Sequence, residues 1–246
     1  MIEVRHLQKS FGANLILDDV SFRIENGESV AIIGRSGGGK SVLLKHLVGL
    51  LQPDAGEVLV DGEDIGPLNE RQLLRVRRKF GMVFQGAALF DSMTVAENVA
   101  FAFRRHKNLS AGEIAKRVAA ALEMVDLPGT EDRKPAELSG GMRKRVGLAR
   151  AIIYEPQIVL YDEPTTGLDP IVSDSIDKLI IRVRDHLKVT SIVVTHDMRS
   201  ARRVGNRVMM LHEKKIYANA APEAFFASTD PIVRQFVDGV ADAKEV

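Results

Sequence analysis

The stretch GRSGGGKS, from Gly34 to Ser41, has the residue types and spacing of a loop that holds phosphate. It fits G-x-x-x-x-G-K-[ST] and stands between the apolar run ESVAIIG and a segment with helical periodicity, the context that this pattern requires. Glycines let successive N–H groups turn onto phosphate oxygens, and the start of a helix adds partial positive charge. Lys40 is then placed to reach the β- and γ-phosphates, and the Ser41 hydroxyl to ligate Mg²⁺. The sequence predicts a nucleotide site here.

Two carboxylates, Asp162 and Glu163, end the apolar run IVLY. In open α/β sheets ligands lie beyond the carboxyl ends of strands, where these side chains would be placed. An Asp-Glu pair on its own is more often a helix cap or a solvated turn. Together with a phosphate loop it favours chemistry, in which Asp162 holds Mg²⁺ directly or through water and Glu163 accepts a proton from the attacking water.

A second glycine-rich segment, ELSGGMRKRV, begins at Glu137. Apolar residues at helical spacing place the start of a helix near Ser139, Gly140 and Gly141, and a hydroxyl, exposed N–H groups and a helix dipole make an anion site. Taken alone, the segment is better explained as a serine N-cap whose glycines relax the loop. It belongs to a helical block separate from the phosphate loop, so it is poorly placed to close on a nucleotide held by its own chain.

Three further positions are unremarkable singly. Asp169-Pro170 predicts a helix start, with the aspartate as N-cap and the proline at the first helical position. Gln85 and His196 each follow a β-like run, and a lone histidine there is more often structural or exposed than functional. Only their combination with the loop and the acidic pair is specific.

The composition of the 246 residues sets limits on function. A net charge of +1 supplies no global field that would recruit nucleic acid, so we expect no nucleic-acid partner. The absence of cysteine excludes disulfides and thiolate metal sites. We expect no signal peptide, because MIEVRHLQKSF is charged from its third residue, and no apolar run approaches the ~20 residues that span a bilayer. The basic clusters at 71–79, 142–145 and 199–203 are interpreted as solvated helix faces.

Hydrophobic periodicity predicts strands in IEVRHL, SFRIEN, ESVAIIG, GEVLVDG, KFGMVFQ, QIVLYDEP, SIVVTH, NRVMML and KKIYAN. One helix follows the phosphate loop, with Leu43, Leu47, Leu50 and Leu51 on one face and Pro53 as its end. Ser110 and Glu113 predict a capping box before another helix. Strand–helix alternation around an inserted helical block indicates a mostly parallel sheet with a helical subdomain.

In this order, the motifs resemble those of the ATP-binding subunits of ABC transporters along essentially the whole chain. Phe11 corresponds to the adenine-stacking aromatic, GRSGGGKS to Walker A, and Gln85 to the Q-loop. LSGGM (138–142) corresponds to the signature, IVLYDEP to Walker B, GLD (167–169) to the D-loop, and His196 to the switch histidine.

The resemblance implies an ATPase that uses ATP and Mg²⁺ in a head-to-tail dimer of two copies. Ser139, Gly140 and Gly141 of one copy then cover the γ-phosphate held by Lys40 of the other, which would give the second glycine segment its role. It implies Glu163, His196 and Lys40 as catalytic residues and Ser41, Gln85 and Asp162 at the metal, with Gln85 also sensing the transport partner. The implied nucleotide contacts are Phe11, Gly34, Arg35, Ser36, Gly37, Gly38, Gly39, Lys40, Ser41, Val42, Ser139, Gly140, Gly141 and, bridging subunits, Asp169.

The fold implied is a P-loop NTPase with a mostly parallel core sheet, an N-terminal antiparallel β part and an inserted helical subdomain. We expect one ABC ATPase domain over 1–246, with its nucleotide-binding core at 1–86 and 155–219 and its signature-bearing subdomain at 87–154. The tail at 220–246 would be helical. It either folds on its own core or contacts the other ATPase subunit.

Two strings, FQGAALFDSMTVAENVAF (84–101) and LSGGMRKRVGLARAI (138–152), are similar to the ATPases of bacterial Mla-type systems, which move phospholipid between the inner and outer membranes. This similarity implies a permease of the MlaE type, a periplasmic lipid-binding subunit of the MlaD type and a STAS subunit of the MlaB type. It places the chain on the cytoplasmic face of the inner membrane.

Two alternatives stay open, the ATPase of a polar-solute importer and a soluble ATPase of the iron–sulfur-assembly type.

Met142, where the family more usually has glutamine, cannot make amide hydrogen bonds.

Overall fold

The computed structural model describes residues 1–105 and 109–240. The chain forms two compact units, Met1–Leu73 with Ile192–Val246, and Leu74–Ser191. The predicted division into a core, a subdomain at 87–154 and a tail stays a prediction.

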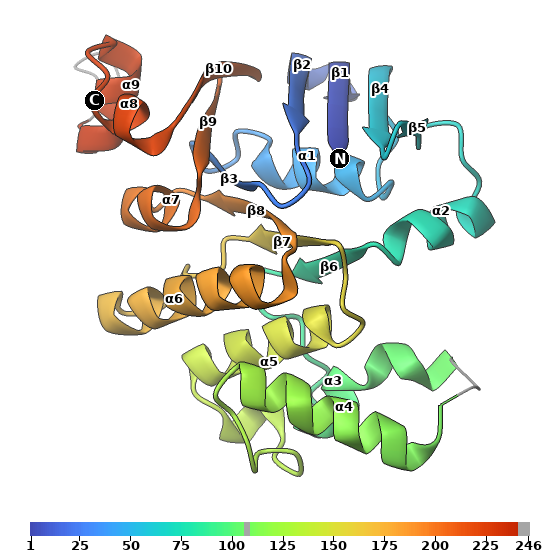
Figure 1. Cartoon of the computed structure of the whole chain (residues 1–246). Helices are drawn as coiled ribbons and strands as arrows, with labels where there is room; N and C mark the ends of the chain where they lie inside the picture. Colours follow the sequence, from blue (N-terminus) through green and yellow to red (C-terminus); the bar gives the residue numbers. More distant parts are fainter. Residues whose placement is uncertain (106–108, 241–246) are drawn as a thin grey trace. The chain divides into compact units, whose positions relative to one another are not determined.

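An antiparallel sheet opens the first unit, and its strands are neighbours in Figure 1. Its order is β2-β1-β4-β5, formed by β1 (Ile2–Phe11), β2 (Asn14–Ile24), β4 (Ala55–Val60) and β5 (Glu63–Asp64). Every pairing is antiparallel, and Phe11 lies opposite Asn14 where β1 turns into β2. Apolar residues of β1 and β2 are buried at Ile2, Val4, Leu17 and Val20, because one face of the sheet is covered and the other meets solvent.

A second set of strands in this unit carries the phosphate loop. It consists of β3 (Ser29–Gly34), β9 (Arg207–His212) and β10 (Lys215–Ala220). β3 pairs in parallel with β9, and β9 pairs with β10 in an antiparallel hairpin. All six residues of β3 are buried, which explains its continuous apolar run. Helices α1 (Lys40–Leu47) and α7 (Met198–Val204) belong here, and β8 (Thr190–Thr195) contributes residues to both units.

The tail folds onto this same unit as far as it is described. It forms α8 (Pro222–Phe226) and α9 (Pro231–Asp238). Phe225 and Val233 are buried in one apolar cluster with Ile33 of β3 and Met210 of β9. The first alternative for the tail, packing on its own core, is therefore what residues 222–238 do, and residues 241–246 lie outside the described part.

The second unit contains β6 (Phe80–Val83) in parallel with β7 (Ile158–Asp162) and most of the helices. The parallel pairs β3–β9 and β6–β7 and the antiparallel N-terminal strands agree with the predicted fold class. α2 (Glu70–Arg77) crosses the boundary between the units. The remaining helical elements are α3 (Val95–Val99), η1 (Phe101–Arg105), α4 (Ala111–Met124), η2 (Pro135–Glu137), α5 (Gly140–Ile152) and α6 (Pro170–Leu187).

Local sequence signals explain where several helices begin. Ser110 and Glu113 form the predicted capping box of α4, with Glu113 N–H donating to Ser110 Oγ at 3.2 Å. Asp169 is the N-cap of α6, as predicted, and Pro170 is its first residue. The helix after the phosphate loop is shorter than predicted. It ends at Leu47 because Gly49 turns left-handed (φ 65°), and Leu50 is exposed rather than on the buried face.

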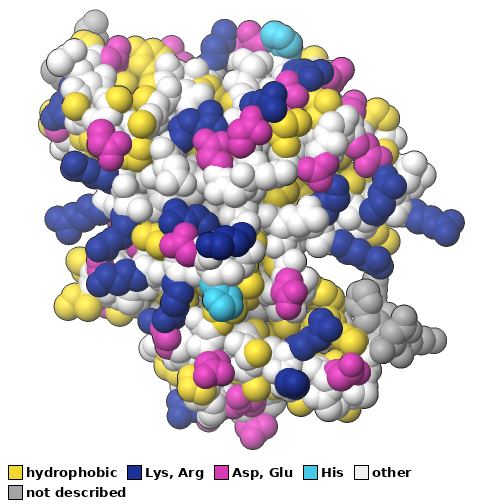
Figure 2. Space-filling view, viewed as in Figure 1, with side chains coloured by type: hydrophobic (Ala, Val, Ile, Leu, Met, Phe, Trp, Pro, Cys, Tyr) yellow, Lys and Arg dark blue, Asp and Glu magenta, His cyan; other side chains and the backbone are white. Residues whose placement is uncertain are grey.

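None of the helices within residues 1–105 and 109–240 combines the length and hydropathy that crossing a bilayer takes. Acidic and basic side chains are interspersed on the face shown in Figure 2, in keeping with the small net charge.

His46 of α1 should make the stability of the protein sensitive to pH. The side chain is fully buried, its Nδ1 lies 2.8 Å from the Val42 carbonyl oxygen, and burial holds its pKa below the ordinary value. A group whose pKa is lower in the folded state binds fewer protons folded than unfolded. The contribution of neutral His46 to the free energy of unfolding is therefore fully present above the unfolded-state pKa of about 6.5. It is lost as the pH drops below that value.

We expect the free energy of unfolding in urea to be lower at about pH 5.5 than at about pH 8. His46→Leu should make this difference smaller, because leucine takes no proton. Wild type and variant losing stability in parallel over this range would contradict the assignment.

Candidate functional site

The phosphate loop joins β3 to α1 and depends on its glycines. Gly37 and Gly39 adopt φ of 73° and 97°, a region that favours residues without a Cβ. A Cβ on Gly39 would also lie 3.1 Å from the side chains of Ile16 and Leu17. The loop can therefore curl tightly against β2, and its tip residues Arg35 and Ser36 are exposed.

Lys40 is the first residue of α1 and only 6% exposed. Its ammonium donates to the carbonyl oxygens of Gly34 at 2.7 Å and Arg35 at 2.9 Å, so the charge is held inside the curl of the loop. The next two residues, Ser41 and Val42, are half-buried at the helix N-terminus. This arrangement sets a cation, a hydroxyl and backbone N–H groups at one place, as phosphate binding requires.

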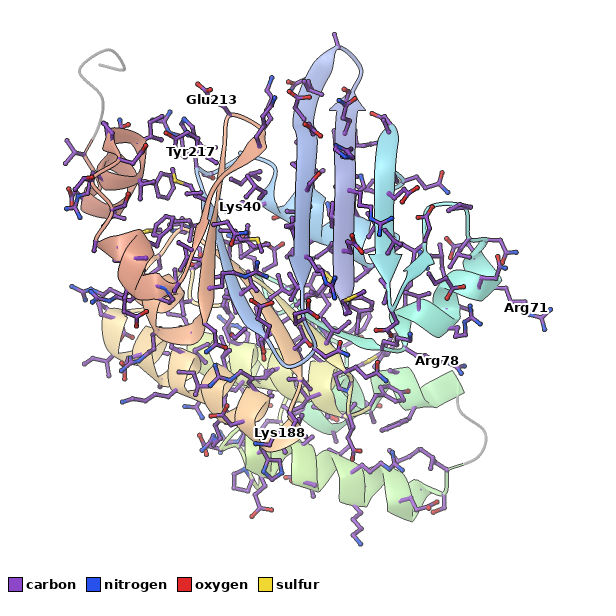
Figure 3. The ribbon with its side chains drawn as sticks, turned by 45° about the horizontal axis from the view of Figure 1, so that its top comes forward. Lys40, Arg71, Arg78, Lys188, Glu213 and Tyr217 are labelled. Atoms are coloured by element: carbon purple, nitrogen blue, oxygen red, sulfur yellow. The ribbon has the colours of Figure 1, made fainter. Side chains whose placement is uncertain are left out.

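Two cavities of the first unit lie against this loop. The larger, of about 500 Å³, is lined by Arg35, Gly37 and Gly38 together with residues 14–16 that follow Phe11. Phe11 itself is 49% exposed, with the Lys9 ammonium 5.6 Å from its ring centroid. Glu213, which also lines this cavity, stands at the tip of the β9–β10 hairpin in Figure 3.

The smaller cavity, of about 370 Å³, brings the predicted switch residue His196 together with Arg35. His196 is exposed just beyond the end of β8. Gln235 of α9 lines both cavities. Residues of the phosphate loop, His196 and the C-terminal helix therefore line these two cavities of the first unit, while Phe11 lines neither. The sequence did not predict the C-terminal helix at this place.

The acidic pair stands at the end of β7 in the second unit. Asp162 is the last residue of the strand and half-buried, and Glu163 is 8% exposed. Glu163 adopts a φ of 50°, which costs an L-residue on the order of 1 kcal/mol and is typical of functional sites. Its Oε2 accepts a hydrogen bond from Thr166 Oγ1 at 3.0 Å. The carboxylate is therefore held in one direction by its neighbours.

The second glycine segment starts α5 as predicted. Ser139 is the N-cap, and its Oγ accepts the Met142 N–H at 3.2 Å. Gly141 packs tightly against α6, since a Cβ there would lie 2.7 Å from Cγ1 of Val172. The capping interpretation of this serine is therefore correct, and its hydroxyl and the helix start stand together as an anion site requires.

The two remaining predicted residues lie in the same unit. Gln85 is exposed just after β6. Asp169 Oδ1 accepts the N–H groups of Ile171 at 2.9 Å and Val172 at 3.0 Å, so the capping role predicted for it is present.

Sequence reasoning missed Lys144. The cluster at 142–145 was interpreted as a solvated helix face, and this is wrong for Lys144, which is 7% exposed. Its ammonium donates to the carbonyl oxygens of Gln85 and Glu163, and burial lowers its pKa, opposed by the charges of Glu163 and Asp162. Spacing could have shown this, because Lys144 follows Gly141 by three residues and precedes Leu148 by four, which is one buried helix face.

Comparisons with known proteins fit these sites. A family model described as ABC transporter matches residues 17–166. The chain belongs to this family. A relative named "Probable ribonucleotide transport ATP-binding protein mkl", from Mycobacterium leprae, is 43% identical over 238 residues, 97% of this chain and 69% of its own length. Another, named "Intermembrane phospholipid transport system ATP-binding protein MlaF", from Escherichia coli, is 40% identical over 242 residues, 98% of this chain and 90% of its own.

A solved ATP-binding cassette, MJ0796, has the same fold with a TM-score of 0.82 and 34% identity, covering 90% of this chain and 99% of that one. It is described as a dimer in a post-hydrolysis state with ADP and Pi bound. The chain is thus a transporter ATPase that binds ATP, with the P-loop NTPase fold expected from its motifs.

The predicted metal ligands suit Mg²⁺ in kind. Ser41, Gln85 and Asp162 offer hydroxyl, amide and carboxylate oxygens, the hard donors that this ion takes together with substrate phosphates. Within residues 1–105 and 109–240 no cluster of three or more His, Cys, Asp or Glu could hold a metal by itself. The chemistry of these donors therefore fits Mg²⁺ that is bound together with nucleotide phosphates.

Gly141→Ala should test how tightly the start of α5 must pack. The added Cβ would meet Cγ1 of Val172 at 2.7 Å, so either α5 or the Val172 side chain has to shift. We expect ATP turnover to fall by up to about 10²-fold, since small displacements of positioning groups cost this much. Steady-state phosphate release measures it.

Gly112→Ala is the matched control, because Gly112 lies in the first turn of α4 with open space around it. Equal turnover in both variants and wild type would contradict the prediction.

Proposed function

We propose that this ATPase powers a membrane transporter that moves phospholipid between the bacterial inner and outer membranes and so maintains outer-membrane lipid asymmetry. One observation carries the proposal: 40% identity to a protein named as an intermembrane phospholipid transport ATPase, along 90% of that protein's length. The strings at 84–101 and 138–152, which resemble Mla-type ATPases, support it.

The proposed partners are those of such a system. They are an MlaE-like permease, an MlaB-like STAS subunit and an MlaD-like periplasmic subunit, and the ATPase lies on the cytoplasmic face of the inner membrane. The second unit exposes Phe84, Phe90 and Phe101, and the rings of the last two stand 4.5 Å apart. These aromatic residues lie on both sides of Gln85 in the chain, Phe84 before it and Phe90 and Phe101 after it. They are the proposed contact for the permease, because exposed aromatic groups mark protein interfaces.

For hydrolysis we propose a dimer of two copies that encloses ATP. Lys40 of one copy holds the γ-phosphate, and Ser139, Gly140 and Gly141 of the other cover it. The dimeric state of MJ0796 supports this arrangement. Glu163 polarises the attacking water, His196 contacts the γ-phosphate, Phe11 stacks on adenine and Asp169 bridges the copies. Mg²⁺ bound at Ser41, Gln85 and Asp162 would neutralise phosphate charge.

The cargo has one named competitor. The relative from Mycobacterium leprae is named for ribonucleotide transport, and an ATPase subunit need not touch its cargo. A polar-solute importer therefore remains the second candidate. A soluble iron–sulfur-assembly ATPase has no comparable observation in its favour.

Mass spectrometry of what co-purifies with the tagged chain from detergent-solubilised membranes tests the function. We expect a multi-span permease, a lipid-binding partner and bound phospholipid. A permease carrying a polar solute in place of lipid would establish the second candidate, and a preparation without any membrane protein would contradict transport of either kind.

Glu163→Gln tests the proposed catalytic role. The amide keeps the size of the side chain but cannot take a proton, so turnover should fall about 10²- to 10⁴-fold, the range of a general base. ATP binding should persist, and the dimer should accumulate in its closed form. Phosphate release, nucleotide titration and size-exclusion chromatography with ATP measure these. A variant that hydrolyses at the wild-type rate would exclude Glu163 as the base.

A further inference from the structure

Helix α5 binds the segment that follows β6. α5 packs against β6 in the second unit (Figure 1). Arg150 donates to the carbonyl oxygens of Ala88 at 2.7 Å and Ala87 at 2.6 Å, and Gly147 leaves space for Ala87, whose Cβ would be 3.3 Å from a Cβ added there. Residues 85–88 are therefore bound to α5 through their backbone.

Lys144 also links α5 to the acidic pair. It lies one turn before Gly147 on the same helix, and its ammonium donates to the Gln85 carbonyl and, at 3.3 Å, to the Glu163 carbonyl. One buried cation therefore joins two segments that are 78 residues apart in the sequence (163 − 85). A lysine suits this link because its ammonium offers three hydrogen-bond donors at the end of a long side chain, which no uncharged side chain does.

Uncommon backbone conformations occur at Glu163 and two to three residues after Gln85. Glu163 has a φ of 50°, and Ala87 and Ala88 have φ of 60° and 47°. L-residues hold such angles only where surrounding contacts fix them. The Glu163 carbonyl is fixed by Lys144 and by the Thr166 N–H at 3.3 Å. Since this carbonyl sets the orientation of the peptide after Glu163, it also sets the direction from which the carboxylate projects.

We propose that Lys144 is a positioning residue for hydrolysis, which ties the Gln85 segment to the backbone of Glu163 and so passes movement of that segment to the carboxylate. The inference rests on the catalytic role proposed for Glu163. A buried lysine with a purely structural role would stabilise the fold equally in every step of the cycle. A positioning lysine acts on turnover alone, and only while the Glu163 carboxylate is present.

Lys144→Met in the full transporter complex separates these roles. Methionine keeps the length of the stem and removes the charge and the donors. We expect kcat for ATP to fall about 10²-fold, as for other small displacements of a catalytic group, while KM for ATP changes less than about twofold. Lys144→Arg restores donors to both carbonyls and should recover most of kcat.

Arg150→Met is the matched control, because it removes a half-buried cation from the same helix, one that binds the same segment through the carbonyl oxygens of Ala87 and Ala88. Lys116→Met, at an exposed position of α4, reports the effect of losing a lysine from the surface. Thermal midpoints show the stability lost in each. If Lys144→Met lowers kcat no more than Arg150→Met at equal loss of midpoint, Lys144 is structural and the proposal fails.

The double variant of Lys144→Met with Glu163→Gln decides whether Lys144 acts through the Glu163 carboxylate. A lysine that acts through the Glu163 carboxylate has nothing further to remove, so Glu163→Gln and the double variant should turn over at the same residual rate. Additive losses would overturn the proposal. If Lys144→Met does not yield a folded complex, Lys144→Gln, with two donors on a shorter stem, takes its place, and an unchanged kcat there overturns it as well.

The outcomes also separate this inference from the proposed function. Turnover that survives Glu163→Gln contradicts the catalytic assignment itself. Turnover that is lost in Glu163→Gln but unchanged in Lys144→Met contradicts only the role of Lys144.

Discussion

A lysine ammonium that leaves water needs oxygen atoms around it, and this requirement shapes both units of the ATPase. Lys40 and Lys144 are each less than a tenth exposed, and the ammonium of each donates to two backbone carbonyl oxygens. Carbonyls belong to the backbone, so each lysine fixes the course of the chain around it. In the first unit that chain is the phosphate loop, and in the second it is the joined backbone of Gln85 and Glu163.

The bond from Lys144 to the backbone has a consequence for chemistry. Lys144 holds the carbonyl of Glu163, while the carboxylate of that residue accepts a hydrogen bond from the neutral hydroxyl of Thr166. The backbone and the side chain of the acid are therefore each directed by a separate neighbour, in a site that is 8% exposed and where preorganised polar groups act most strongly.

Local signals in the sequence were enough for the elements and their starting points. The capping residues Ser110, Ser139 and Asp169 act through neighbours two or three positions away, so their roles can be read without the fold. The end of α1 was also encoded locally, by Gly49, although the leucine spacing that continues to Leu51 concealed it. Tertiary links could not be obtained this way. The spacing of Lys144 indicates a buried helix face, but its partners, the carbonyl oxygens of Gln85 and Glu163, lie 59 and 19 residues away, and no local pattern identifies them.

Met142 shows how far a departure from the usual signature can reach. The N-cap of α5 uses the backbone N–H of residue 142, which donates to Ser139 Oγ, so no side chain at this position enters the cap. Gly141 sets the distance between α5 and α6 and is likewise independent of it. The half-buried methionine therefore replaces an amide without changing the hydroxyl, the glycines or the helix start that make the anion site. What it removes is side-chain hydrogen bonding at the edge of the site. For this reason the methionine affects the contacts that the signature can make with a partner. The geometry of the site itself is set by Ser139 and Gly141.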